Sequence, residues 1–181
     1  ACRSGPDDRA LAISAADRTG AGILSLLLLL LAGSAPAQTT NRVSVSSAGA
    51  LANNSSDGGS LTADGRYLVF QSRASNLVAG DSNGVHDIFL RDRQAGTTTR
   101  ISVSSGGAQA NNASFGSEIT RDGSVVAITS DATNLVSGDT NGAIDLFFRN
   151  MQTGAMTRLM GLAGSQPNGN FVPGVFSEDG R

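Results

Sequence analysis

Residues 80–104 read Gly80-Asp-Ser-Asn-Gly-Val-His-Asp-Ile-Phe-Leu-Arg-Asp-Arg-Gln-Ala-Gly-Thr-Thr-Thr-Arg-Ile-Ser-Val-Ser104, and a close copy runs from Gly138 to Gly161. Eleven positions of this stretch recur unchanged at an offset of 58 residues, and eight of them mark the repeat. They are Asp81, Asn83, Gly84, Asp87, Phe89, Arg91, Gly96 and Arg100, which match Asp139, Asn141, Gly142, Asp145, Phe147, Arg149, Gly154 and Arg158. A fixed period of this length is typical of repeat architectures, in which one supersecondary unit stacks against copies of itself.

Each repeat contains four short apolar bursts separated by residues that favour turns. In the first repeat they lie near Ser60-Leu-Thr-Ala63 and at 66–72, 87–92 and 97–104. Bursts this short, with Gly, Asn, Asp and Ser between them, predict β-strands rather than helices. Asp64-Gly65 predicts a hairpin turn between the first two strands, because Gly accepts a positive φ without steric cost.

The second repeat predicts the same elements, with strands from Glu118 and at 124–130, 145–150 and 156–160. Its second strand is apolar on both faces, like that of the first repeat, which is typical of strands in the middle of a stack. We therefore predict an all-β fold, a partial β-propeller of four-stranded antiparallel blades preceded by a signal-peptide helix.

The repeats divide the chain into two full blades and part of a third. Blade 1 is expected at about 58–105, blade 2 at about 116–161, and a partial blade 3 at 171–181, where the motif is cut at its turn. In front of them, an orphan strand at 42–46 copies the fourth strand. In a ring of blades, such a strand could complete the final blade and remove the exposed sheet edges.

The ends of the sequence also carry a prediction. The first residue is Ala1, the first Met is Met151, and the third repeat breaks off at Arg181. We interpret the chain as a fragment of a longer protein. On its own, we expect it to associate through its open sheet edges.

Residues 1–37 predict a leader with a secretory signal peptide. The run at 23–33 is almost pure Leu, which suits the apolar region of a signal peptide and is too short to span a bilayer. Ala35-Pro36-Ala37 then supplies a cleavage site, so we expect cleavage after Ala37. The alternative interpretation of the run is a buried core helix. The repeats would occupy the mature chain, 38–181, in the periplasm or outside a bacterial cell.

Composition excludes several kinds of site. The only cysteine is Cys2, inside the expected leader, so the mature chain would hold no disulfide and no Cys-based metal or redox site. The 13 basic residues are all Arg, and with 15 acidic residues the chain is close to neutral. No basic stripe is available to neutralise phosphates, which argues against a nucleic-acid partner. After signal cleavage we expect no membrane partner, and the protein or glycan partner is unknown.

The motifs resemble a known repeat. Leu61-Thr-Ala-Asp-Gly-Arg-Tyr-Leu-Val-Phe70, then Asp87-Ile-Phe-Leu-Arg-Asp92 and Thr98-Thr-Arg-Ile-Ser102, are similar to the WD40-like, TolB-type β-propeller repeat. In that family an Asp-Gly turn precedes an apolar strand, and an Asp-Ile-Tyr-type strand leads to an Arg-Leu-Thr-type strand. The resemblance spans 42–181. Its period is longer than the 40–45 residues typical of WD40 blades, and the extra residues lie in Asn/Gly/Asp loops.

The repeated loops offer a candidate metal site. Asp81, Asn83 and Asp87, and again Asp139, Asn141 and Asp145, resemble a shortened calcium loop. Calcium takes six to eight oxygen ligands, so backbone carbonyls, water or a neighbouring blade would have to complete each site. The alternative is structural. Asn-Gly makes the turn, the first Asp caps it, and the last Asp fixes the loop onto the next strand.

Other polar residues of the repeats suggest structural roles. His86 has Ile144 as its counterpart and is expected to be a solvated loop residue. Asp64 and Asp122 each precede a Gly and are expected to be turn residues. Asn53 and Asn111 are expected to satisfy the backbone of the loop that enters each blade. Arg91 with Asp92, and Arg149 with Asn150, are expected to form an inter-blade polar contact or a solvated strand end.

No constellation for catalysis is found in the sequence. It contains no Gly-x-Ser-x-Gly elbow, no His-Glu-x-x-His motif and no phosphate-binding Gly loop. We therefore expect an exported, non-enzymatic β-propeller scaffold that binds a protein or ligand, with no cofactor unless calcium binds. Two alternatives remain. One is the accessory or gating propeller of a secreted hydrolase of the prolyl-oligopeptidase kind. The other is a calcium-stabilised surface adhesion module.

Overall fold

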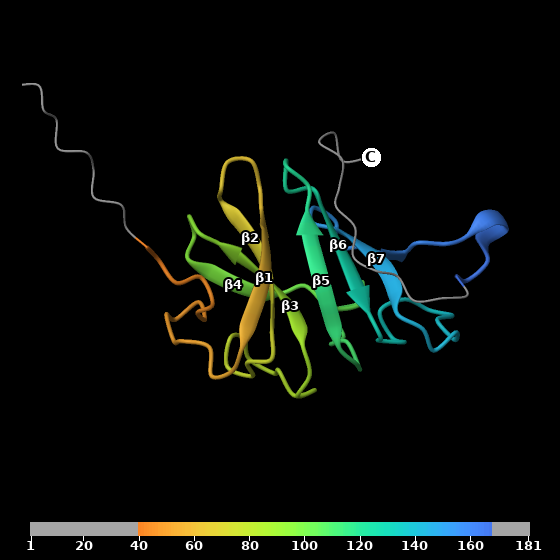
Figure 1. Cartoon of the computed structure of the whole chain (residues 1–181), viewed down its shortest axis with the longest axis horizontal. Helices are drawn as coiled ribbons and strands as arrows, with labels where there is room; N and C mark the ends of the chain where they lie inside the picture. Colours follow the sequence, from red (N-terminus) through yellow and green to blue (C-terminus); the bar gives the residue numbers. More distant parts are fainter. Residues whose placement is uncertain (1–39, 168–181) are drawn as a thin grey trace, which may run out of the picture. The chain divides into compact units, whose positions relative to one another are not determined.

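The computed structural model describes residues 40–167. They form two four-stranded antiparallel sheets, each with its strands in sequence order (Figure 1). The sheet of blade 1 contains β1 (Ser56–Leu61), β2 (Tyr67–Ser72), β3 (Asp87–Asp92) and β4 (Thr97–Arg100). The sheet of blade 2 contains β5 (Ser114–Ile119), β6 (Val125–Ser130), β7 (Asp145–Asn150) and β8 (Met156–Arg158). A short 3-10 helix, η1 (Leu162–Gly164), follows.

These sheets confirm the predicted all-β fold of propeller blades. The expected leader at 1–37 and the partial blade at 171–181 lie outside the described residues. In the part of the chain that the structure describes, no helix is long and apolar enough to cross a membrane.

The first strand of each blade begins earlier than its sequence suggests. β1 starts at Ser56 and β5 at Ser114, in stretches rich in Gly and Ser. Both strands contain a register shift, between Asp57 and Ser60 in β1 and between Phe115 and Ser117 in β5. A positive-φ glycine lies at each shift, Gly58 or Gly116, which is why an apolar pattern alone does not reveal these strands.

The fourth strand of blade 1 ends earlier than predicted. β4 stops at Arg100 rather than at Ser104. Just beyond it, the hydroxyl Oγ of Ser102 accepts the backbone N–H of Ile88 at 3.1 Å. β8 also ends earlier than predicted, at Arg158 rather than Met160, and Arg158 is the counterpart of Arg100. Because Met160 has no hydroxyl, the early end is a feature of both repeats and not of Ser102 alone. After Ser102 the chain turns, and Val103 forms a single bridge with Gln109.

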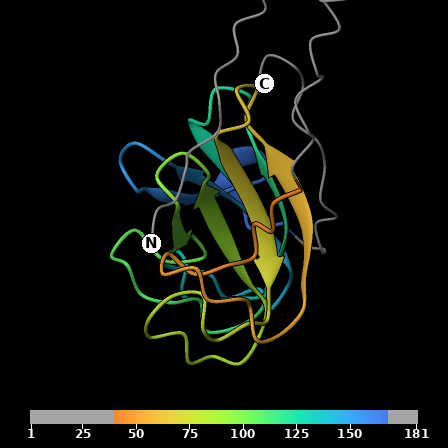
Figure 2. The same cartoon turned by 90° about the vertical axis from the view of Figure 1, so that its left-hand side faces the viewer.

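Residues 42–46 form no strand. They are the repeat counterpart of 100–104, the segment that follows β4, and Val45 makes one bridge with Leu51. The segment lies against blade 1, where the hydroxyl of Thr98 donates to the carbonyl oxygen of Val45 at 2.5 Å. Figure 2 shows it in orange in front of the strands of blade 1. The orphan segment at 42–46 therefore packs on blade 1.

The main apolar core lies between the two blades. Val69 and Ile88 from blade 1 pack with Ile128 and Phe147 from blade 2, and all four are buried. Burying side chains of this size stabilises a fold by roughly 1.5–3 kcal/mol each. A second cluster, of Phe70, Ala74, Leu77 and Phe89, lies on the other side of blade 1. Its two rings are stacked with centroids 5.7 Å apart.

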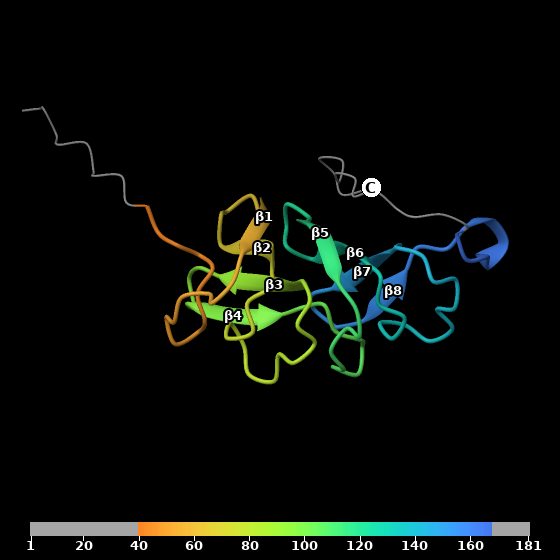
Figure 3. The same ribbon diagram turned by 60° about the horizontal axis from the view of Figure 1, so that its bottom comes forward.

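Strand β5 carries the contact from one blade to the next. It packs against β1, β2 and β3, and Figure 3 shows it beside them. Three backbone donors of β5 reach blade 1, and the first is the N–H of Ser114, which donates to the carbonyl oxygen of His86 at 2.8 Å. The N–H of Gly116 donates to Oε1 of Gln71 at 3.1 Å, and that of Ile119 donates to Oγ of Ser60 at 3.2 Å. The blades therefore meet through both apolar and polar contacts.

Candidate functional site

The residues of the first predicted loop site come together around an arginine. Nη1 of Arg100 lies 3.3 Å from Oδ1 of Asp81 and 3.8 Å from Oδ2 of Asp87. Nδ2 of Asn83 donates to Oδ2 of Asp87 at 3.0 Å. The pairing of Phe89 with Arg100 in the β3–β4 ladder places the arginine beside the loop. The three predicted residues therefore share one site, and its centre is a guanidinium group.

Two further residues complete this cluster. The hydroxyl of Ser102 donates to Oδ1 of Asp87 at 2.5 Å. Nε2 of Gln109 donates to Oδ1 of Asp81 at 2.9 Å and to Oδ2 of Asp87 at 3.1 Å. Sequence reasoning missed both, because neither recurs unchanged at the repeat offset. The recurrence of Arg100 was a usable signal that the arginine belongs with the loop.

Blade 2 repeats the arrangement with closer ion pairs. Nη1 of Arg158 lies 2.7 Å from Oδ1 of Asp139 and 3.2 Å from Oδ2 of Asp145. Nδ2 of Asn141 donates to Oδ1 of Asp145 at 3.2 Å. Gln166 accepts the N–H of Thr140 as Gln109 accepts that of Ser82, but in the cluster its Oε1 accepts from Nη1 of Arg158 at 3.3 Å. The second predicted site is thus also built around an internal cation.

Both clusters are almost closed to solvent. Asp87 and Asp145 are fully buried, and the side chain of Arg158 is 4% exposed. Burial raises the pKa of Asp81, and the neighbouring Asp87 raises it further. Burial likewise raises the pKa of Asp139, although Arg158 acts against this shift. Removing charges from water is costly, so each cluster depends on its ion pairs and hydrogen bonds.

The geometry shows what each loop can offer a cation. The amide nitrogen of Asn83 faces Asp87, while its oxygen accepts the N–H of Val85 at 3.3 Å. The guanidinium already lies beside the carboxylate oxygens that a hard cation would use. Within residues 40–167, no three His, Cys, Asp or Glu side chains gather in a way that could hold a metal ion. Calcium at these loops therefore stays a prediction, and it would require the arginine to move.

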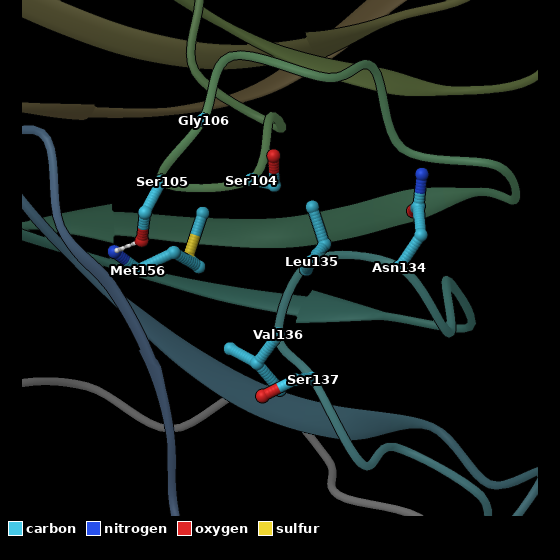
Figure 4. A pocket seen from close by; sticks show the side chains of 8 residues that line it. All are labelled: Ser104, Ser105, Gly106, Asn134, Leu135, Val136, Ser137 and Met156. Carbon is cyan, nitrogen blue, oxygen red and sulfur yellow. Dashed lines mark hydrogen bonds between the residues drawn. The ribbon is translucent and has the colours of Figure 1, made fainter.

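A separate pocket opens beside the second blade, with a volume of about 580 Å³. The connector at 104–106 lies along it, the loop at 134–137 forms another part, and Met156 reaches it from β8 (Figure 4). Ser105 is fixed there, because its Oγ accepts the backbone N–H of Met156 at 2.8 Å. The remaining lining residues are hydroxyl, amide and aliphatic side chains, so the pocket lining carries no charge.

Comparison with known proteins gives matches among solved structures alone. No family model and no curated protein sequence matches the chain. TolB from Acinetobacter baumannii is 20% identical, over 71% of this chain and 25% of that one, with a TM-score of 0.43. A putative TolB from Agrobacterium tumefaciens is 20% identical, over 70% of this chain and 40% of that one, also with a TM-score of 0.43. The chain thus spans less than half of either structure.

The turn residues lie where the sequence predicted them. The hydroxyl of Thr62 donates to Oδ1 of Asp64 at 2.5 Å, and the same carboxylate oxygen accepts the N–H of Arg66 at 3.0 Å. Asp122 repeats this role, and the N–H and hydroxyl of Ser124, with the hydroxyl of Thr120, lower its pKa to about 2. These carboxylates are hydrogen-bonded turn caps.

The loop asparagines and the strand arginine also have structural partners. Oδ1 of Asn53 accepts the N–H of Ser75 at 3.0 Å, and Oδ1 of Asn111 accepts the N–H of Thr133 at 3.0 Å. Nη1 of Arg91 donates to the carbonyl oxygen of Ser46 and to that of Gly96. Arg91 thereby ties the N-terminal segment to blade 1. Its counterpart Arg149 makes the predicted inter-blade polar contact, since its Nη1 donates to the carbonyl oxygens of Val103 at 2.9 Å and Ser104 at 3.3 Å.

Proposed function

We propose that the chain forms the propeller part of an exported, non-enzymatic scaffold that binds a neutral segment of a protein partner. The observation that carries this proposal is the pocket between residues 104–106 and 134–137. It lies on loops, where repeat scaffolds commonly bind their ligands. Its lining combines hydroxyl groups with a buried aliphatic floor.

The repeated charged residues support binding rather than chemistry. Asp87 and Arg100 of blade 1, like Asp145 and Arg158 of blade 2, are engaged with one another inside the fold. A catalytic acid or base must reach the reacting group in a substrate. These four side chains instead hold the long loops in place, and a rigid loop is what a binding surface requires.

The chemistry of the pocket favours a neutral ligand with hydrogen-bond acceptors. Ser104 accepts a backbone N–H from Ala108 and Ser105 accepts one from Met156, which leaves each hydroxyl hydrogen available as a donor. Leu135 and Met156 are buried and supply an apolar floor. A peptide segment with an aliphatic side chain matches both features, through its carbonyl oxygens and its apolar group.

Binding can be tested with acetyl-Ala-Leu-Ala-amide as the probe. Titration into the isotope-labelled chain should shift the backbone amide signals of Ser105, Gly106 and Ser137. Ser137→Trp should abolish these shifts by filling the pocket. Ala79→Trp is the matched control, since Ala79 is the blade 1 counterpart of Ser137 and is also exposed. Absent shifts, or shifts that survive Ser137→Trp, would contradict the proposal.

Export is a second part of the proposal, and it rests on the Leu-rich run at 23–33 with the Ala35-Pro36-Ala37 site. N-terminal sequencing of the protein recovered from the cell envelope or medium should begin at Gln38. Recovery from the cytoplasm with the run intact would contradict export and leave the pocket assignment untouched.

A further inference from the structure

The residues that line the pocket beside blade 2 can be compared with their repeat counterparts in blade 1. Of the eight lining residues, five recur unchanged 58 positions earlier. Gly106 and Ser137 each correspond to an alanine, which is an exchange between small residues. Met156 corresponds to Thr98, which is an exchange between a long thioether and a short hydroxyl side chain. The largest chemical difference between the two sets therefore lies at Met156.

The backbone at this position is held in the same way in both blades. The N–H of Met156 donates to Oγ of Ser105 at 2.8 Å. The N–H of Thr98 donates to Oγ of Ser47 at 2.9 Å. Both side chains are buried. The two residues therefore hold equivalent places in the fold, and their side chains alone set them apart.

In blade 1 the hydroxyl of Thr98 has a structural role. It donates to the carbonyl oxygen of Val45 at 2.5 Å and accepts from Nη1 of Arg91 at 3.0 Å. Val45 is buried, and a buried carbonyl group requires a hydrogen-bond donor. A polar side chain is therefore needed at this position of blade 1.

In blade 2 an arginine supplies the donor instead. Nη1 of Arg149 donates to the carbonyl oxygen of Val103, the counterpart of Val45, at 2.9 Å. Val103 thus has its donor without a hydroxyl group on Met156. The thioether side chain of Met156 has no backbone group to satisfy, and together with Leu135 it lines the pocket (Figure 4).

We propose that Met156 determines the specificity of this pocket, so that it selects an aliphatic side chain of the partner and rejects a polar side chain of similar size. This inference rests on the proposed binding function of the pocket. A methionine side chain is flexible and polarisable, so it adapts its packing to an aliphatic group. It offers little to a polar side chain, which would leave water without gaining a hydrogen bond in return.

Two probes of similar shape test the selection, acetyl-Ala-Leu-Ala-amide and acetyl-Ala-Asn-Ala-amide. Titrations followed by the backbone amide signals of Ser105 and Gly106 give a Kd for each probe. The wild-type chain should prefer the leucine probe by at least about tenfold. Met156→Thr, which introduces the blade 1 residue, should weaken binding of the leucine probe by about tenfold and bring the two Kd values close together.

Two further variants serve as controls. Met156→Leu keeps an apolar side chain and should retain the preference for the leucine probe. Met160→Thr changes an exposed methionine outside the pocket lining and should leave both Kd values unchanged. The amide spectrum shows whether each variant is folded. If Met156→Thr is not, Met156→Gln replaces it, with the same expected loss of preference.

The possible failures can be told apart. Equal Kd values for the two probes in the wild-type chain would overturn the inference and leave the pocket assignment standing. A preference that survives both Met156→Thr and Met156→Gln would do the same. A wild-type chain that binds neither probe would overturn this inference together with the proposed function.

Discussion

The clusters of the two blades share their charged residues and differ in what closes them. Around Arg100, Ser102 donates to Asp87 and also accepts the N–H of Ile88. Around Arg158, the counterpart of Ser102 is Met160, which is exposed and offers no hydroxyl. Blade 1 thus satisfies its buried carboxylate with residues of the connector to blade 2. The difference indicates that a cluster is completed by the segment leading into the next blade.

The largest expected effect comes from removing the central cation. Arg100→Ala leaves Asp81 and Asp87 buried without their positive partner, and breaking a buried pair in this way costs about 3–5 kcal/mol. The free energy of unfolding, measured by urea titration, should fall by that amount. Arg158→Ala should lower it at least as much, because its ion pairs are shorter. Arg93→Ala, on the surface, should change it by less than about 0.5 kcal/mol. Equal effects of Arg93→Ala and Arg100→Ala would show that the buried ion pairs of Arg100 do not stabilise the fold.

The second prediction compares the stability cost of truncating a buried side chain with that of truncating its exposed counterpart in the other blade. Ile101→Ala empties a site buried between the blades and should cost about 2–4 kcal/mol. Leu159→Ala, at the same repeat position in blade 2, removes an exposed side chain and should cost under about 1 kcal/mol. Unfolding in urea measures both. Equal costs would contradict the difference in burial between Ile101 and Leu159.

The difference between Ser102 and Met160 can be tested directly. Ser102→Ala removes a hydrogen bond to a buried carboxylate and should lower the free energy of unfolding by about 1.5–3 kcal/mol. Met160→Ser places the missing hydroxyl in blade 2 and should leave stability unchanged or raise it. A loss with Met160→Ser as large as that with Ser102→Ala would show that the hydroxyl is not what completes the cluster.

A smaller effect concerns how the stability of the fold depends on pH. Asp92 forms an ion pair with Arg66 at 2.8 Å, and this partner, with backbone N–H groups, lowers the pKa of Asp92 to about 2. A lowered pKa adds stability above the ordinary value of 3.8, and this stability is lost as the pH falls from about 4 toward 2. Blade 2 has Asn150 at this position. Asp92→Asn should therefore melt lower than the wild type at pH 6 and converge with it near pH 2. A difference that is constant with pH would contradict the assignment.

The strands show how much the sequence could predict. β3 and β7 have the predicted bounds, and β2 and β6 begin one residue later, because their apolar runs are flanked by turn residues. The ends of β4 and β8 could not be predicted, since the residues that follow Arg100 and Arg158 are still strand-like in sequence.

The candidate site was predictable to a similar degree. The loop spacing correctly brings Asp81, Asn83 and Asp87 together. Arg100 recurs at the same offset as the loop, but it lies 13 residues beyond Asp87 along the chain. Only the β3–β4 pairing places the guanidinium at the site, and spacing within the loop carries no information on that pairing.

A thermal melt of the full chain in excess calcium and in excess chelator tests most directly whether arginine or a metal ion holds the two loops. Arg100 and Arg158 already supply the positive charge in both clusters. The melting temperatures are therefore expected to be identical under the two conditions. A melting temperature that rises with calcium, and that stops rising in Asp81→Asn or Asp139→Asn, would show that a metal ion rather than arginine holds these loops.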